Sequence, residues 1–134
     1  MKICFFVLMC ILVQHSLAQH KIFQGNSTAL NHLVATYYNG KIYRGNSTSV
    51  KDIVGNIKDG RIFYGIASSF DKLAGTIKDD KIYRGNSTSF KDLAGTIKDG
   101  KIFRGNSTSL NHLIGRYEGG AMSGAAAAAF LLLL

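Results

Sequence analysis

The feature that most constrains the fold is a period of 20 residues, which runs without a gap from residue 21 to residue 120. In every unit the first position is Lys or Arg, the second is Ile, the third is Phe or Tyr, and the fifth is Gly. Repeats of about 20 to 50 residues are typical of folds in which similar units pack side by side. We therefore expect one repeat domain, and we number positions 1 to 20 within each unit. The units are residues 21–40, 41–60, 61–80, 81–100 and 101–120.

The clearest unit, "KIYRGNSTSFKDLAGTIKDG" at residues 81–100, contains two short strand patterns. "KIYR" is β-branched and aromatic, and in "LAGTI" the residues Leu93, Gly95 and Ile97 alternate onto one face. Between them, "GNSTS" and the final "KDG" hold the Gly, Asn, Asp and Ser residues that favour turns. Each unit is therefore predicted to be a β-hairpin.

A single hairpin is only marginally stable in water, so the units must bury their apolar side chains against one another. The sequence thus predicts an all-β fold with five 20-residue β-hairpin repeats around a pseudo-rotational axis. The invariant Ile at position 2 is expected in the shared interior, at Ile22, Ile42, Ile62, Ile82 and Ile102. Glycine at position 15 indicates close backbone approach near the axis, at Gly55, Gly75, Gly95 and Gly115.

The segments "LAGTIKDGKIF" (93–103) and "LAGTIKDDKIY" (73–83) resemble the repeat of bacterial β-flower proteins. In that family, short hairpins are arranged as petals around a pseudo-rotational axis. The resemblance covers about residues 21–118 and implies the petal fold, but it implies no established activity. That family is known for four petals, whereas this chain has five units and a longer "RGNSTS" connection.

The first 18 residues have the order of a secretory signal peptide: Lys2, an apolar run, and small residues at Ser16 and Ala18. We predict cleavage after Ala18, and we rank lipidation of Cys10 well below it. Both cysteines, Cys4 and Cys10, lie in this segment, so residues 19–134 have none for a disulfide. A secreted or periplasmic, envelope location follows. The remaining 15 Lys and Arg against eight Asp and Glu give a formal charge near +7.

Residues 121–134 form an apolar tail after the repeat domain of residues 19–120, and residues 125–134 hold no polar side chain. As a helix, those ten residues would extend about 15 Å, roughly half of a bilayer core. Two interpretations remain open: the tail folds back through Gly119–Gly120 to fill the repeat domain, or it contacts a membrane or sister tails. We favour burial within the domain, as an Ala-rich helix.

The "GNSTS" loop raises three interpretations. A phosphate-binding loop requires a following helix, whereas here a strand pattern follows, so we discount it. The same residues form glycosylation sequons, but we favour the simpler prediction that they are turn residues. The predicted structural turn residues are Gly45, Asn46, Gly85, Asn86, Gly105 and Asn106.

Recurring carboxylates such as Asp52, Asp92 and Asp99 invite an acid/base interpretation. Catalysis by paired carboxylates needs two different environments, whereas symmetric copies share nearly the same one. We therefore predict no catalytic residue and no cofactor. His32 and His112 occupy matching positions in the first and last units, but two histidines without a third ligand lead us to predict no metal site.

Cations recur at positions 1 and 4, where a rotational fold would arrange them in rings. These candidate anion-binding residues are Lys21, Lys41, Arg61, Lys81, Lys101, Arg44, Arg84 and Arg104. We predict a non-enzymatic structural or binding module of the bacterial envelope, with anionic glycans or lipid headgroups as partners and no nucleic acid. The alternatives are membrane association or oligomerisation through the tail, and a glycan-active enzyme that uses the aspartates. Homo-oligomerisation stays open.

Overall fold

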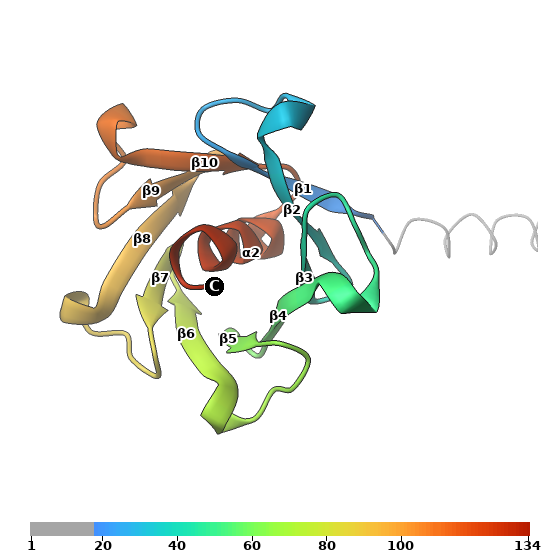
Figure 1. Cartoon of the computed structure of the whole chain (residues 1–134). Coiled ribbons are helices and arrows are strands. Elements are labelled where there is room, and N and C mark those ends of the chain that lie inside the picture. The colour runs from blue at the N-terminus through green and yellow to red at the C-terminus, as the bar shows by residue number, and fades with distance from the viewer. Residues whose placement is uncertain (1–17) are drawn as a thin grey trace, which may run out of the picture.

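The structure is a computed structural model and describes residues 18–134 (Figure 1). The strands are β1 (His20–Gln24), β2 (Leu33–Tyr38), β3 (Lys41–Arg44), β4 (Ile53–Lys58), β5 (Arg61–Tyr64), β6 (Leu73–Lys78), β7 (Lys81–Arg84), β8 (Leu93–Lys98), β9 (Lys101–Arg104) and β10 (Leu113–Tyr117). The 3-10 turns are η1 (Leu30–His32), η2 (Val50–Asp52), η3 (Phe70–Lys72), η4 (Phe90–Asp92) and η5 (Leu110–His112), and the one α-helix of the described residues is α2 (Ala121–Leu132). The predicted signal peptide, apart from Ala18, lies outside the described residues.

The ten strands form a closed barrel in which each strand pairs antiparallel with its neighbours in sequence. β1 pairs with β10, where Ile22 lies opposite Tyr117, so the first and last units are neighbours. Figure 1 shows the resulting ring, with the loops and 3-10 turns at its periphery. The predicted all-β ring of five hairpin units is confirmed, and the ring closes.

Two-residue turns join one unit to the next. In the first of them, Asn39 and Gly40 have φ of 51° and 78°. Positive φ at both central residues is the requirement of the type I′ turn, whose twist matches that of the flanking strands. Asp79 and Asp80 adopt the same conformation, with φ of 52° and 61°. The Asn, Asp and Gly residues at positions 19 and 20 therefore have a conformational role.

Successive residues of a strand point to opposite sides of the barrel wall. The isoleucines at position 2 point inward, and all five are 0 % exposed, as predicted. The aromatic residues at position 3 point outward and are nonetheless mostly buried, because the loop of the same unit covers them. Phe103, for example, is 4 % exposed and lines a surface hollow with Thr108 and Leu110 of its own loop.

Helix α2 fills the interior of the barrel (Figure 1). Residues 125–129, all alanine, are at most 2 % exposed. A helix that is buried on every side must be apolar on every side, and alanine combines small volume with high helix propensity. The predicted apolar helix that folds back into the repeat domain is confirmed. Within residues 18–134, no helix has both the length and the apolar character needed to cross a bilayer.

The C-terminal leucines occupy the space that the glycines at position 15 leave open. A Cβ atom on Gly55 would lie 2.7 Å from Leu134 Cδ1 and 2.8 Å from the carbonyl oxygen of Phe63. The corresponding pairs are Leu133 with Gly75, Leu132 with Gly95 and Leu131 with Gly115. The close approach predicted from these glycines is confirmed, and the leucines and a neighbouring strand carbonyl are what approach.

The last turn of the C-terminal segment is wider than an α-helical turn. The backbone N–H groups of Leu133 and Leu134 both donate to the carbonyl oxygen of Ala129, at 2.9 Å each. Leu134 is five residues beyond Ala129, whereas an α-helix bonds residues four apart. Phe130 lies near Arg44, which pairs with Ala35 at position 15 of the first unit. Residues 131–134 thus lie against the fifth, fourth, third and second units in turn, one leucine to each unit.

Candidate functional site

Cations face each other across three of the four turns between units. The residue at position 18 lies directly opposite the cation at position 1 of the next unit. These pairs are Lys58–Arg61, Lys78–Lys81 and Lys98–Lys101. Such residues have Cβ atoms about 4.5–5.5 Å apart, and like charges at this separation destabilise a sheet. The same turns carry Asp59, Asp79, Asp80 and Asp99, so charges of both signs lie at the turn end of the barrel, with a positive excess at the Lys58–Arg61 and Lys98–Lys101 turns.

Few of these cations have an anionic partner. Lys51 and Asp52 form the sole ion pair of residues 18–134, with 3.7 Å between Nζ and Oδ2. Lys21 donates from Nζ to the side-chain oxygen of Asn46 at 2.6 Å, which links the first unit to the second. The guanidinium of Arg61 lies 5.7 Å from the ring centroid of Phe70, within cation–π range. The position-1 cations are half-buried. Of these, Lys21 contacts a polar side chain and Arg61 contacts an aromatic ring.

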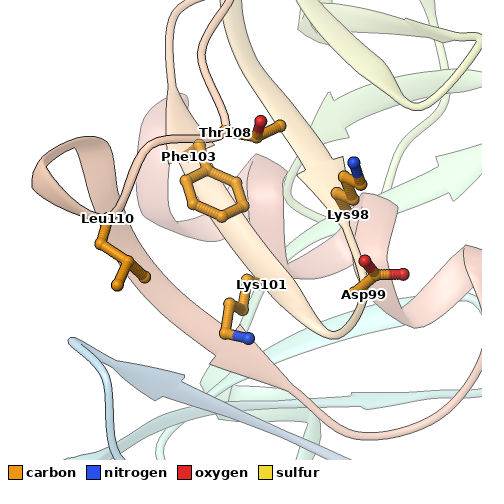
Figure 2. A pocket seen from close by; sticks show the side chains of 6 residues that line it. All are labelled: Lys98, Asp99, Lys101, Phe103, Thr108 and Leu110. Carbon is orange, nitrogen blue, oxygen red and sulfur yellow. The ribbon is translucent and has the colours of Figure 1, made fainter.

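One surface cavity, of about 220 Å³, lies between the fourth and fifth units (Figure 2). Its lining residues are Lys98, Asp99, Lys101, Phe103, Thr108 and Leu110. Lys98 and Asp99 come from the turn after the fourth unit, and the other residues come from positions 1, 3, 8 and 10 of the fifth unit. The cavity combines two ammonium groups and one carboxylate with apolar surface, so its charged lining is positive by one and could take an anionic group that carries an apolar part.

A second cavity, of about 560 Å³, shares Lys98, Asp99 and Thr108 with the first. It extends toward the start of α2, where Ala121 and Tyr117 line it. Its remaining lining residues are Asp79, Asp80, Lys81, Thr96 and Ile97. Its charged lining is mixed, with three carboxylates and two ammonium groups, so it is a poorer anion site than the first cavity.

The residue at position 16 fixes each loop to the unit before it. Thr36, Thr76 and Thr96 donate from Oγ1 to the carbonyl oxygens of Gly45, Gly85 and Gly105, at 2.7–2.8 Å. Asn56 bonds the carbonyl oxygens of Gly65 and Ala67 at 2.9 and 3.0 Å. Arg116 donates to the Asn26 side-chain oxygen at 3.3 Å across the junction of the first and last units. Loop position therefore depends on contacts between units.

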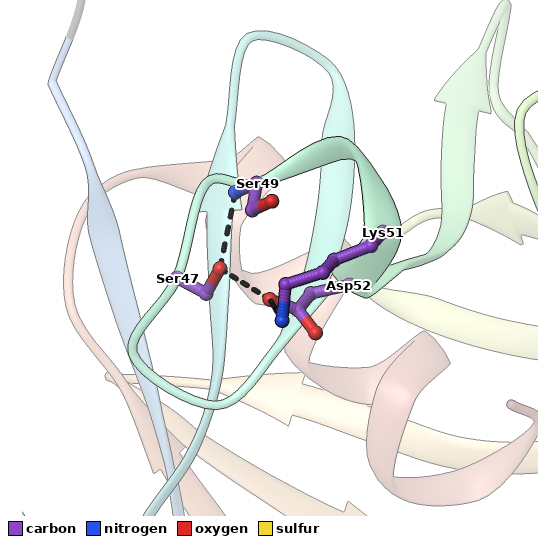
Figure 3. A network of polar contacts seen from close by, with 4 residues as sticks. All are labelled: Ser47, Ser49, Lys51 and Asp52. Atoms are coloured by element: carbon purple, nitrogen blue, oxygen red, sulfur yellow. Dashed lines mark hydrogen bonds and ion pairs between the residues drawn. The ribbon is translucent and has the colours of Figure 1, made fainter.

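Within the loops, serine and aspartate side chains form a small network (Figure 3). Ser47 donates from Oγ to Asp52 Oδ2 at 2.6 Å and accepts the backbone N–H of Ser49 at 3.0 Å. Ser87 and Asp92 repeat the first contact at 2.7 Å. These bonds, together with φ of 68–73° at Gly45, Gly85 and Gly105, give the loop residues the turn geometry expected of them.

The carboxylates considered for catalysis have structural contacts. Asp52 and Asp92 each accept a serine hydroxyl, and Asp59, Asp79 and Asp99 hold the turns in the left-handed conformation. In the third unit, the hydroxyl of Ser69 donates to Asp71 and lowers the pKa of that carboxyl below its usual value. The recurring aspartates are therefore spread over the loops and turns, one unit apart.

The position-4 cations lie at the other end of the short strands from the position-1 cations. Arg44, Arg84 and Arg104 are exposed. They are paired with position 15 of the preceding unit, and directly paired residues point to the same side of a sheet. Their side chains therefore point inward, around the C-terminal end of α2. The five position-1 cations and the three position-4 arginines therefore lie at opposite ends of the barrel.

His32 and His112 are both exposed, on η1 and η5 of the adjacent first and last units. In residues 18–134, no group of three or more His, Cys, Asp or Glu residues is arranged to hold a metal ion. Neither histidine lines the two cavities described above.

Exposed apolar side chains at position 10 were missed by the sequence reasoning. All five lie on the 3-10 turns and are 67–77 % exposed: Leu30, Val50, Phe70, Phe90 and Leu110. The signal was available, because position 10 is apolar in every unit, although position 11 is polar in every unit and position 9 is polar in four of the five. Apolar character alone does not distinguish position 10 from the core positions, and the exposed 3-10 turns on which it lies are visible only in the structure.

Comparison with protein families gives one match. The family model described as "6-fold beta flower protein" matches residues 12–131. No curated protein and no solved structure matches the chain. The resemblance is thus confirmed at the level of β-flower proteins, whereas the four-fold type is not.

Proposed function

The chain belongs to the 6-fold beta flower family, and from this premise we propose that it is a non-enzymatic, multivalent module that binds anionic groups. Its ligands are the phosphate, sulfate or carboxylate groups of envelope glycans or lipids, and the repeated cations contact them. Removal of residues 1–18 by the secretory pathway would place the module in the envelope or the secreted space. The family relation supports a repeat module, and the ligand and location are our proposal.

The observation that carries this proposal is the pairing of like charges across the turns. Lys78–Lys81 and Lys98–Lys101 lie directly opposite each other, which costs the folded state free energy. A bound anion between the two ammonium groups would remove that repulsion. The cavity of Figure 2, which Lys98 and Lys101 line together with the single carboxylate of Asp99, offers such a place.

Repetition increases the effect of each weak contact. Once one cation pair holds an anionic polymer or surface, the next pair binds at a high effective concentration. Three turns of this barrel carry the paired cations, and the closed ring fixes the distances between them. A repeating anionic ligand is therefore favoured over a single small anion.

The test is binding to an immobilised anionic polysaccharide such as dextran sulfate. A Lys81→Gln/Lys98→Gln/Lys101→Gln variant should bind about tenfold or more weakly than the parent chain. A control variant with Lys51→Gln, Lys72→Gln and Lys91→Gln removes the same charge from exposed loop lysines and should lose threefold or less. Binding should weaken as salt is raised toward 0.15 M, where the Debye length is about 8 Å. Equal losses in both variants would contradict a specific role for the turns.

The two alternative functions, a glycan-active enzyme and a tail that inserts into a membrane, would each require a different observation. A glycan-active enzyme would need turnover that Asp92→Asn abolishes, although the Asp92 carboxylate is already engaged by Ser87. Insertion of the tail into a membrane would require residues 125–129 to leave the barrel, where they are almost fully buried. Polysaccharide turnover sensitive to Asp92→Asn would replace our proposal with the first alternative.

A further inference from the structure

The barrel has a distinct surface at the end where the C-terminal segment emerges, which we call the mouth. It comprises Phe130, residues 131–134 and the position-4 residues around them. In Figure 1 the C-terminus lies within the ring of strands at this end. The position-4 residues are Gln24, Arg44, Tyr64, Arg84 and Arg104.

The centre of the mouth is apolar and only partly covered. Residues 125–129 are buried inside the barrel, whereas residues 130–134 are all half-buried. These five residues are consecutive at the C-terminal end of α2, so they lie together at the mouth. Grouped apolar surface of this kind is typical of an interaction site, unlike single exposed apolar residues.

Exposed cations surround this apolar centre. Arg44 lies with its guanidinium 6.0 Å from the ring centroid of Phe130, and Tyr64 donates from its hydroxyl to the carbonyl oxygen of Leu133 at 3.4 Å. Arg84 and Arg104 lie directly opposite Gly75 and Gly95, the glycines beside Leu133 and Leu132. None of the five position-4 residues is acidic. The mouth thus joins an apolar centre to a positive border.

We propose that the mouth docks on the surface of an anionic lipid bilayer. Phe130 and the leucines contact the boundary between headgroups and acyl chains, and the three arginines contact lipid phosphates. A Trp, Phe or Leu surface bordered by Arg or Lys is the pattern of proteins that lie on membranes. This inference rests on the proposed anion-binding function and names lipid as the ligand at this end.

Charge and shape favour a bilayer over the other occupants. A second copy placed mouth to mouth would bring three arginines against three arginines, with no acidic position-4 residue to neutralise them. An anionic glycan would satisfy the arginines but would leave the leucines in contact with water. A bilayer surface supplies both anionic headgroups and an apolar layer, and docking requires no spanning helix.

The first test measures co-sedimentation of the full chain with vesicles of phosphatidylcholine alone or with 30 % phosphatidylglycerol. The parent chain should bind the anionic vesicles only. An Arg44→Gln/Arg84→Gln/Arg104→Gln variant should bind them about 30- to 100-fold more weakly, since each cation near the surface contributes to membrane affinity. The Lys51→Gln/Lys72→Gln/Lys91→Gln control carries the same net charge and should lose at most about threefold. Equal loss in both variants would overturn the inference.

The second test reports which surface touches the lipid. The chain has no tryptophan, so Phe130→Trp introduces a single tryptophan at the mouth, whose emission is excited selectively at wavelengths that tyrosine does not absorb. Its emission should shift to the blue on anionic vesicles and should be quenched by brominated acyl chains. Phe90→Trp, on an exposed 3-10 turn, is the matched control and should change little. A shift at position 90 without one at position 130 would overturn docking through the mouth.

The outcomes separate this inference from the proposed function. A chain that binds dextran sulfate through its turn lysines but ignores anionic vesicles retains the proposed function and refutes membrane docking. A parent chain that binds neither dextran sulfate nor anionic vesicles refutes both the proposed function and membrane docking. Circular dichroism of each variant, matched to the parent spectrum, excludes unfolding as the cause.

Discussion

Glycine at position 15, which has no side chain, allows the C-terminal leucines to lie close to the barrel wall. Gly95 shows why, because a Cβ there would meet Leu132 Cδ1 and would lie 2.6 Å from the carbonyl oxygen of Phe103. The leucine side chain can shift, whereas the backbone carbonyl belongs to a paired strand. Glycine is therefore required here for space, and its φ is not in the left-handed region.

We expect Gly95→Ala to lower the free energy of unfolding by about 1–3 kcal/mol, the usual cost of overpacking a filled interior. Urea unfolding of the full chain measures it. Gly120→Ala is the control, because no atom lies within 4 Å of the added Cβ and the φ of −93° suits any residue. A Gly95→Ala chain as stable as the Gly120→Ala chain would show that the wall moves outward freely.

A second prediction at the residue scale concerns Tyr37, at position 17 beside the central helix. Burial raises the pKa of its phenol above the usual value of about 10. The neutral form is thus favoured by folding, so its contribution to stability is complete below the unfolded pKa and is lost as pH rises through the folded pKa. Tyr37→Phe should reduce the loss of unfolding free energy between about pH 9 and 11.5. An unchanged alkaline profile would contradict this.

At the scale of elements, α2 differs from a surface helix because the sheet surrounds it on all sides. Its central turns are alanine alone, and a larger side chain at any of residues 125–129 would meet the inner wall. The isoleucines at position 2 are the largest wall side chains that all five units bury against α2, so the small helix and the large wall residues are complementary. Packing at interior density permits little adjustment between them.

Ala127→Leu adds three carbon atoms at a position that is 0 % exposed. We expect it to destabilise the chain by about 1–3 kcal/mol or more in urea unfolding, through displaced wall residues. Met122→Leu, in the same helix at 50 % exposure, should change stability by less than about 0.5 kcal/mol. If Ala127→Leu stabilised the chain instead, the interior would contain unfilled space.

At the scale of the whole molecule, the barrel and the helix form a single core. Every unit contributes an isoleucine to the interior, and α2 contacts the first and last strands as well as β7, β8 and β9. The ring also closes through the pairing of β1 with β10, so no unit is stabilised by local contacts alone. Unfolding should therefore be one cooperative transition.

A chain that ends at Gly120 tests this. Without α2, the five inward isoleucines would surround a space that water fills, so the truncated chain should unfold without cooperativity or aggregate. Differential scanning calorimetry and size-exclusion chromatography of the two chains measure the difference. A monomeric truncated chain with a sharp transition near that of the full chain would show that the barrel is stable when empty.

Much of this fold was predictable because the repeat is regular. The strand and turn patterns within each period predicted the hairpins. The invariant Ile predicted the interior positions, and the Asp and Gly residues predicted the turns. The position-10 residues were not predictable, because apolar character alone does not distinguish a buried residue from one on an exposed 3-10 turn. The choice between burial of the tail and membrane contact depended on the width of the barrel, which strand number and tilt determine together.

The widened last turn implies a rule for the number of repeats. Residues 131–134 each lie beside the position-15 glycine of one unit, so four leucines match the four units that have glycine at this position. Barrel diameter grows with strand number. With a sixth hairpin, the wall would be too far from the central helix for alanine side chains to contact it. The family is described as six-fold. A relative with six hairpins should therefore carry bulkier residues along its central helix and one more apolar residue at its end, so that unit number and tail sequence change together.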